Sequence, residues 1–363
     1  MNANAPSPYG RPVQPFWKRN ATVRILIVFC LWLLLCATVQ AAQTIHPGFK
    51  TLGVWEPETA IRLDFAIWYP ARRAPFTLDY GDWVFSAARG ATPLPGQHPL
   101  ILLSHDSPGS RFSLHMLASE LARNGFVVIA PTHTGDNLND MRFLYTGAQL
   151  ISRVEELRAS LDILLQHPST ASLIDPQHIG ILGIGPGGTA GIMLAGGELD
   201  PQRWDEYCTG KKNDPYCQSW VKPRMDALVT TPYLNTSFLD KRIRAAVAVA
   251  PAYGMLLEPT TLSSIQIPIL LLHAEKETLC PQYLVESIRA ALPATADYAV
   301  ITNADAISLT SPCGKGTLAQ TLPEICRPVP ERAQVQAELA EKATLFFLTH
   351  LGTAAQFSSL KKD

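Results

Sequence analysis

The chain has 363 residues, of which 47% are hydrophobic and 17% are charged, and its formal net charge at pH 7 is -1. This apolar content is sufficient for a large buried sheet, and α/β chains of this length often form one domain. A chain without excess positive charge has no electrostatic attraction to polyanions, so we expect no nucleic acid among its partners.

The N-terminus has the pattern of an export signal. Basic residues precede an apolar run over 25–39, and small residues follow it up to Ala42. This order is typical of a cleaved signal peptide, here spanning residues 1–42. The alternative is an uncleaved anchor in the inner membrane, although 25–39 is short for a hydrocarbon layer of about 30 Å. We therefore predict an exported protein, periplasmic or secreted, that meets a membrane only through this segment if it is retained.

Five cysteines follow the signal segment. In an oxidising compartment their local spacing predicts two short-range disulfides, Cys208–Cys217 and Cys313–Cys326. Cys280 is then left without a partner. We interpret it as a small apolar residue beside the end of a strand rather than as a reactive thiol.

Strand and helix patterns alternate along the rest of the chain. Two β-rich runs, 51–55 and 62–69, predict an opening antiparallel pair, and a polar stretch up to Gln97 separates this pair from the main sheet. Short continuous apolar runs predict strands that are buried on both faces. These strands cover 99–104, 126–130, 179–182, 245–250, 268–273 and 298–301, and the main predicted helices cover 113–124, 149–166 and 330–351.

This alternation predicts an α/β fold with a doubly wound, mostly parallel sheet flanked by helices. We expect a single domain over 43–352, with a polar excursion at about 197–240 that carries the first disulfide and a polar tail at 353–363. The last helix is expected to end at Gly352.

Polar residues gather in the loops that follow the predicted strands. The carboxyl ends of the strands are where ligands bind in open α/β sheets. The candidate residues there are His105, Asp106, Ser107, His133, Asp136 and Glu277. His105, Asp106, His133, Asp136 and Glu277 include the side chains of metal ligands, but their spacing is not diagnostic, so we predict no metal. We also expect no cofactor.

A glycine-rich corner, Gly183-Ile-Gly-Pro-Gly187, joins a buried strand to an apolar helix, and short motifs occur in a fixed order around it. These are Ile67-Trp-Tyr-Pro70, His98-Pro99, Leu103-Ser-His105, Gly135-Asp-Asn137, Ala248-Val-Ala-Pro251, Ser308-Leu-Thr-Ser-Pro-Cys313 and Pro323-Glu-Ile-Cys326. With them the chain resembles the exported bacterial dienelactone-hydrolase-like proteins, relatives of platelet-activating-factor acetylhydrolase. The resemblance covers residues 47–351 and implies the α/β-hydrolase fold.

The same resemblance assigns the catalytic positions. In that family a serine in a G-x-S-x-G-G corner is the nucleophile. Its position here is Gly185, the position of the catalytic histidine is Ala306, and Glu277 matches the acid. Pro186 has no N–H to donate to an oxyanion. Asp106 stands where glycine is usual, and a carboxylate there opposes a developing oxyanion.

These replacements predict a catalytically degenerate hydrolase that keeps its fold and binds a small acyl or lipid-like ligand, or a protein partner, without turnover. One alternative is a cell-envelope interaction module that uses 197–240 as its contact surface. The other is an ester hydrolase with a relocated site. Its candidate nucleophiles are Ser104, Ser107, Ser110 and Cys280, and its candidate bases are His105, His133 and His273.

Four charged residues of the helix 149–166 are interpreted mainly as a solvated face. They are Arg153, Glu155, Glu156 and Arg158. Arg153 lies where relatives carry an arginine, so a structural ion pair is the alternative for this residue.

Overall fold

The computed structural model describes residues 44–56, 61–218, 221–229 and 236–352. The predicted signal segment 1–42 and the polar tail 353–363 lie outside the described residues. The chain from Ile45 onward forms one compact unit. Among the described residues, no helix combines the length and the apolar character that a membrane crossing needs.

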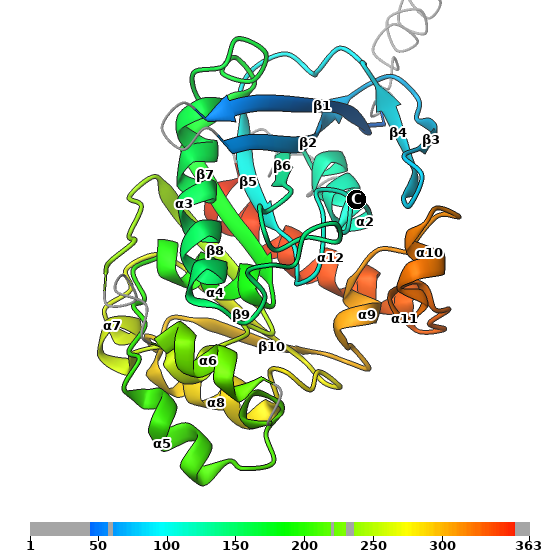
Figure 1. Cartoon of the computed structure of the whole chain (residues 1–363). Helices are drawn as coiled ribbons and strands as arrows, with labels where there is room; N and C mark the ends of the chain where they lie inside the picture. Colours follow the sequence, from blue (N-terminus) through cyan, green and yellow to red (C-terminus); the bar gives the residue numbers. More distant parts are fainter. Residues whose placement is uncertain (1–43, 57–60, 219–220, 230–235, 353–363) are drawn as a thin grey trace, which may run out of the picture. The chain divides into compact units, whose positions relative to one another are not determined.

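Ten strands of the described chain form one sheet, in the order β10-β9-β8-β7-β5-β6-β2-β1-β4-β3 (Figure 1). They are β1 (His46–Glu56), β2 (Ile61–Ala71), β3 (Phe76–Asp79), β4 (Val84–Arg89), β5 (His98–Ser104), β6 (Val127–Pro131), β7 (Ile174–Ile184), β8 (Ile243–Val249), β9 (Ile269–Ala274) and β10 (Asp297–Ile301). Strands β5 to β10 pair in parallel, whereas β2 is antiparallel to both β1 and β6. The predicted mostly parallel sheet with an antiparallel N-terminal pair is confirmed.

Helices cover both faces of this sheet. The helices α2 (His115–Arg123) and α12 (Arg332–Leu351) pack together on one face, and α3 (Gly147–Leu164) and α4 (Pro186–Leu194) pack on the other (Figure 1). The shorter ones are α5 (Arg203–Gly210), η1 (Pro215–Cys217), α6 (Lys222–Val229), η2 (Gly254–Leu256), α7 (Pro259–Ser263), α8 (Gln282–Ala291), α9 (Ala306–Leu309), α10 (Leu318–Thr321) and α11 (Pro323–Cys326). The helices predicted at 113–124, 149–166 and 330–351 are all present, with ends shifted by about two residues.

The polar stretch before Gln97 was predicted only to separate the opening pair from the main sheet, but it also contains strands. It contains β3 and β4, which pair with each other and extend the sheet beyond β1. Phe85 and Ala87 of β4 are buried and alternate with exposed neighbours, which is the period of a half-buried strand. Because the buried positions include small alanines, the apolar signal in the sequence is weak.

Both predicted disulfides are confirmed, Cys208–Cys217 and Cys313–Cys326. Cys280 is a free, buried thiol, and its Sγ donates to the carbonyl oxygen of Pro251 at 3.1 Å. Burial raises the pKa of the Cys280 thiol. These contacts agree with a packing role for this residue.

Candidate active site

The glycine-rich corner joins β7 to α4 and lies at the carboxyl end of the sheet. Gly185 has φ 57° and ψ -124°, a backbone conformation that favours glycine, and Pro186 is the first residue of the helix. The corner is tied to the end of β8. The Gly185 N–H donates to the carbonyl of Val249 at 3.0 Å, and its own carbonyl accepts from the Ala252 N–H at 3.1 Å. The chain therefore keeps the sharp strand-to-helix turn that presents a nucleophile in hydrolases.

The Asp106 carboxyl group occupies the space in which a side chain at position 185 would lie. A Cβ built on Gly185 would overlap Asp106 Oδ1 and would lie 2.8 Å from its Cγ. The Ser107 N–H donates to Asp106 Oδ1 at 2.7 Å, which fixes the carboxyl group in place. Burial, and next the charge of Glu277, raises the pKa of Asp106 to about 7. An acidic side chain therefore fills the space that any side chain at position 185 would need.

The cavity beside this corner has a volume of only about 30 Å³. Gly185, Pro186 and Glu277 all line it, so the structure brings the nucleophile and acid positions together. The histidine position, Ala306, begins α9, but Leu309 is the residue of α9 that reaches the cavity wall. Since a water molecule needs roughly 10–15 Å³ of such volume, the cavity has room for about two waters.

Tyrosine side chains close the cavity. Tyr216 and Tyr253 are each about 1% exposed, and their ring centroids lie 5.3 Å apart. Tyr145 packs edge-on against Tyr216, with the ring centroids at 6.2 Å. All three line the cavity. Because Tyr216 belongs to the excursion 197–240, this excursion helps to fill the cavity beside Gly185. We call its segment 214–217 the plug.

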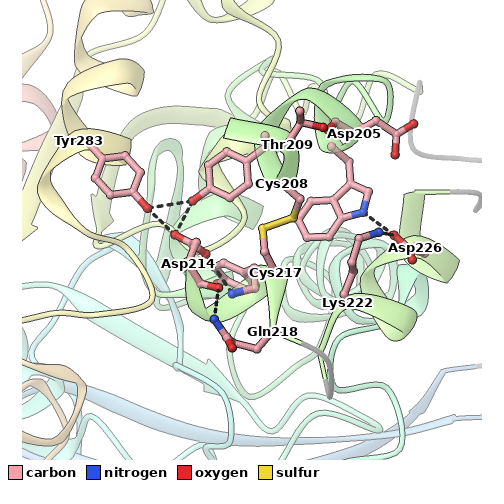
Figure 2. The surroundings of a disulfide bond; sticks show 12 residues. Asp205, Cys208, Thr209, Asp214, Cys217, Gln218, Lys222, Asp226 and Tyr283 are labelled. Carbon is pink, nitrogen blue, oxygen red and sulfur yellow. Dashed lines mark hydrogen bonds and ion pairs between the residues drawn. A yellow bond between two sulfur atoms is a disulfide. The ribbon is translucent and has the colours of Figure 1, made fainter. Parts of the chain in front are cut away.

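The segment that carries Tyr216 is held at several points, as Figure 2 shows. The disulfide Cys208–Cys217 joins α5 to η1. Asp214 accepts a hydrogen bond from the Tyr207 hydroxyl at 2.6 Å and another from the hydroxyl of Tyr283 on α8. It also accepts from the backbone N–H of Tyr216 at 2.9 Å. The plug is therefore anchored to its own loop and to α8.

A chain of hydrogen bonds with the order of a Ser-His-acid triad lies behind the first two loops. Ser104 Oγ is 2.9 Å from His133 Nε2, and His133 Nδ1 is 2.8 Å from Glu156 Oε2. Ser104 and His133 are 0% exposed and Glu156 is 7% exposed. Burial, and next the charge of Arg153, lowers the pKa of His133 well below its usual range. This arrangement has the order of a triad, but its serine has no exposed surface.

The buried ion pair Arg153–Asp136 supports the same loops. Arg153 Nε donates to Asp136 Oδ2 at 2.7 Å, and its Nη1 donates to the carbonyl of His105 at 2.5 Å. Gln149 Nε2 donates to the same oxygen, Asp136 Oδ2, at 2.8 Å. The structural ion pair that the sequence allowed for Arg153 is confirmed, because both partners are fully buried.

His105 and Ser107 are also engaged in this interior. His105 Nδ1 donates to the carbonyl of Asp106 at 2.6 Å, and its Nε2 accepts from the His133 N–H at 3.2 Å. The Ser107 hydroxyl donates to Asp136 and accepts from Gln149 Nε2 at 3.0 Å. Burial lowers the pKa of His105 well below its usual range. Neither ring nitrogen of His105 is available as a general base.

The remaining candidates lie apart from the cavity. Ser110 Oγ accepts from the Phe112 N–H at 3.2 Å, which is a turn contact, and His273 lies within β9. Cys280 is not on the described cavity wall. Within the described residues, no three His, Cys, Asp or Glu side chains are grouped as metal ligands.

The interpretation of Glu156 as part of a solvated face was wrong. Glu155 and Arg158 are exposed, but Glu156 is buried against His133 because it lies one turn after Arg153 on the inner face of α3. Glu156 follows Arg153 by three residues, and this spacing places both side chains on one face of a helix, which is the sequence feature that could have indicated its burial. Tyr216 and Tyr253 were missed as cleft residues, since nothing local to their sequence marks them.

No protein-family model matches the chain, and no curated protein sequence matches it. Solved structures are similar. A ferulic acid esterase from Streptomyces cinnamoneus has a TM-score of 0.55 and 19% identity, covering 87% of this chain and 92% of that one. A dienelactone hydrolase from Anabaena variabilis has a TM-score of 0.49 and 15% identity, covering 84% and 99%. At sequence identities below 20%, structural similarity establishes only that the fold is shared. With its parallel sheet, helices on both faces and sharp β7–α4 corner, this chain has the α/β-hydrolase fold.

Proposed function

We propose that this protein is a catalytically degenerate α/β-hydrolase of the dienelactone-hydrolase-like kind. The observation that carries the proposal is the corner itself. Gly185 supplies no nucleophile, and the Asp106 carboxyl group occupies the space that a nucleophile needs. In a serine protease, loss of the nucleophile or the base alone lowers turnover by about 10⁶. Ordinary triad hydrolysis is therefore expected to be absent.

Two neighbouring features support the proposal. Pro186 offers no N–H to an oxyanion, and Ala306 has no side chain that transfers a proton. Above about pH 7, where Asp106 ionises, its charge would also repel an oxyanion that formed at the corner. Nucleophile, base and oxyanion donor are thus replaced together, as expected where selection favours stability over activity.

The two disulfides support export, because disulfides persist mainly in oxidising compartments. Together with the signal pattern over 1–42, they favour a periplasmic or secreted protein. The same location suits the proposed relatives of the chain.

The proposed acyl or lipid-like ligand does not fit the cleft in its closed form. A volume of about 30 Å³ is far below the roughly 300–1,000 Å³ of small-molecule sites. Binding of such a ligand beside Gly185 requires that Tyr216 move out of the cleft. Retained binding at this place is therefore coupled to opening of the excursion.

Hydrolysis at Ser104 is the second candidate function, and the Ser104–His133–Glu156 geometry favours it. Burial argues against it, because a serine with no exposed surface meets no ester. Arg153 Nη1 also donates to Ser104 Oγ at 3.3 Å, which holds the hydroxyl in the interior.

Hydrolysis of short p-nitrophenyl esters separates the two candidates. The wild-type protein and a Ser104→Ala variant are each assayed across esters of two to eight carbons. We expect both to match the rate of buffer alone. Wild-type turnover that Ser104→Ala abolishes would establish the second candidate instead, whereas turnover that Asp106→Asn abolishes would place the chemistry at the corner.

A further inference from the structure

Two tyrosines that lie outside the cavity beside Gly185 meet at one carboxylate. Tyr207 lies on α5 and Tyr283 lies on α8, 76 residues apart in the chain. Their hydroxyl oxygens are 3.1 Å apart. Both hydroxyls donate to Asp214 Oδ2, that of Tyr207 at 2.6 Å, and Figure 2 shows Tyr283 in contact with Asp214 near the disulfide. The two phenol groups therefore share one hydrogen-bond acceptor, and we call Tyr207 and Tyr283 the tyrosine pair.

Contact between the hydroxyl groups brings together the ring carbons at which oxidised tyrosines couple. A phenol that loses one electron and one proton shares its unpaired electron between the oxygen and the ring carbons beside the C–O carbon. These carbons flank the hydroxyl group, so hydroxyl oxygens 3.1 Å apart bring the coupling carbons of the two rings close to each other. Trp204 stacks on Tyr207 with centroids 6.2 Å apart, and Lys211 Nζ lies 4.0 Å from the centroid of Tyr283. Both rings are thus held in place before any reaction.

Asp214 supplies the proton acceptor that the oxidation needs. A phenol becomes a strong acid when it loses an electron, so its proton must pass to a base at the same time. The Asp214 carboxylate already accepts a hydrogen bond from each phenol, and such bonds to an ionised acceptor are short and strong. Burial, and next the hydrogen bond to Asp214, raises the pKa of both Tyr207 and Tyr283. Each phenol therefore keeps its proton until it is oxidised.

Solvent reaches the tyrosine pair but does not reach the tyrosines of the cavity. Tyr283 is 38% exposed and Tyr207 is partly exposed. Tyr216 and Tyr253 also have rings close together, with centroids 5.3 Å apart, but each of them is about 1% exposed. An oxidant in solution meets Tyr283 and not the buried rings. Selectivity for the tyrosine pair therefore follows from both contact and exposure.

We propose that the tyrosine pair is a site of oxidative modification, at which a peroxidase-type one-electron oxidant couples Tyr207 to Tyr283 as dityrosine and thereby fixes the plug. Each phenol gives one electron to the oxidant and one proton to solvent by way of Asp214. A carbon–carbon bond forms between the two rings, and the hydrogen on each coupled carbon then moves to the oxygen of its own ring, which restores both hydroxyl groups. Hydrogen peroxide, as the final acceptor, takes up the two electrons and two protons and becomes two molecules of water.

The new bond would act on the plug because of where the tyrosine pair lies. Asp214 is the first residue of the plug, and Cys217 is its last and is bonded to Cys208 on α5. A Tyr207–Tyr283 bond would add a covalent tie from α5 to α8, where hydrogen bonds alone now join the two helices through Asp214. The proposal is independent of the loss of hydrolysis, because it requires neither a substrate nor a ligand in the cleft.

Treatment of the folded full chain at low concentration with a peroxidase and hydrogen peroxide tests the proposal. After digestion, mass spectrometry seeks a joined pair of peptides that contains Tyr207 and Tyr283 and is lighter by two hydrogen atoms. We expect this product from single chains, and we expect no product that joins Tyr216 to Tyr253. Absence of the Tyr207–Tyr283 product would overturn the proposal. A product that joins Tyr283 of two chains in its place would overturn it as well, because exposure alone would then decide the reaction.

The variant Tyr207→Phe separates the tyrosine pair from the effect of exposure. It removes one hydroxyl group, keeps the ring, and leaves Tyr283 at the surface. The matched control is Tyr298→Phe, which changes a partly exposed tyrosine on β10. We expect the blue dityrosine fluorescence of the treated protein to be lost in Tyr207→Phe and kept in Tyr298→Phe. Fluorescence that is undiminished in Tyr207→Phe would place the coupling elsewhere and overturn the proposal.

The variant Asp214→Asn tests the proton acceptor. An amide oxygen still accepts hydrogen bonds from the phenols, but it is a far weaker base than a carboxylate. We expect dityrosine to form at least about tenfold more slowly, as for the loss of a general base, and the same Tyr207–Tyr283 product to appear on longer treatment. A rate equal to that of the wild type would contradict the proposed role of Asp214.

Amide exchange at 214–217 measures whether the bond fixes the plug. We expect exchange in the cross-linked wild type to be at least about tenfold slower than in the untreated protein, because a covalent tie restricts the open state of the segment. Tyr207→Phe treated in the same way should show no change. Unchanged exchange in wild-type protein that carries the cross-link would overturn the proposed effect on the plug.

Discussion

At the scale of single residues, the side chain of Asp106 determines which chemistry is possible at the corner. Its carboxyl group fills the space beside Gly185, and Glu277 faces the same cavity. Burial disfavours the charged form of Asp106, and the nearby charge of Glu277 adds to this effect, so the pKa of Asp106 rises. The carboxyl group beside Gly185 therefore keeps its proton up to about pH 7.

The raised pKa of Asp106 makes stability dependent on pH. The folded state binds this proton up to about pH 7, whereas the unfolded chain releases it near 3.8. The resulting stability is complete below about pH 4 and is lost as the pH rises through 7. We expect Asp106→Asn to be more stable than the wild type at pH 8, by on the order of 2–4 kcal/mol, and similar to it at pH 4. Urea unfolding at both values measures this. Parallel pH profiles would show that Asp106 ionises normally.

The Arg153–Asp136 pair is expected to be structurally essential. Both side chains are fully buried, so Arg153→Met leaves a buried carboxylate without its partner and should lower the free energy of unfolding by about 3–5 kcal/mol. The control is Arg62→Met, which breaks the exposed pair with Asp64 and should cost less than about 1 kcal/mol. Equal losses in the two variants would mean that burial contributes little to the Arg153 pair.

At the scale of elements, the sequence correctly predicts the strands and helices that have continuous apolar runs, and the disulfides between cysteines close in the chain. The strands β5 to β9, the helix α3 and both disulfides fall within this class. The pair β3 and β4 was missed because its buried positions include small residues that also occur in loops. The burial of Glu156 was not predicted, because a glutamate on a helix is usually exposed. Here its carboxyl group is buried because it is hydrogen-bonded to His133.

The closed cleft could not be predicted from local sequence. Tyr216 lines the same cavity as Gly185 although the two residues are far apart in the chain. Asp214, two residues before Tyr216, is held by Tyr283, which lies 69 residues further along. Contacts at such separation leave no periodic signal. Motif positions identified Gly185 and Glu277 as cavity neighbours, whereas the residues that fill the cavity required the structure.

Loss of the first disulfide is expected to loosen the plug. The double variant Cys208→Ala/Cys217→Ala should lower the free energy of unfolding by about 2–3 kcal/mol, because a short loop is no longer closed in the unfolded chain. Amide exchange at 214–217 should also accelerate. The matched control is Cys313→Ala/Cys326→Ala, which should leave exchange at 214–217 unchanged. Unaltered exchange in the first variant would show that Asp214 and its tyrosines hold the segment without the disulfide.

At the scale of the whole molecule, the chain has the α/β-hydrolase fold, and the carboxyl edge of its sheet beside Gly185 is largely filled by side chains. The parallel sheet and the sharp β7–α4 corner are present, and the cavity beside Gly185 has room for only about two waters. The proposed absence of hydrolysis is compatible with this fold, because the chemistry of such a fold depends on a few side chains at the strand ends.

Labelling with a fluorophosphonate probe tests the central claim most directly, namely that hydrolysis is absent because the corner lost its reactive groups. The wild type is compared with a variant that combines Asp106→Gly, Gly185→Ser, Pro186→Ala and Ala306→His. The Asp106 change is needed because its carboxyl group overlaps the restored side chain. We expect no labelled peptide from the wild type and a label at position 185 in the variant. A label on Ser104 or Ser107 of the native wild-type protein would contradict the account.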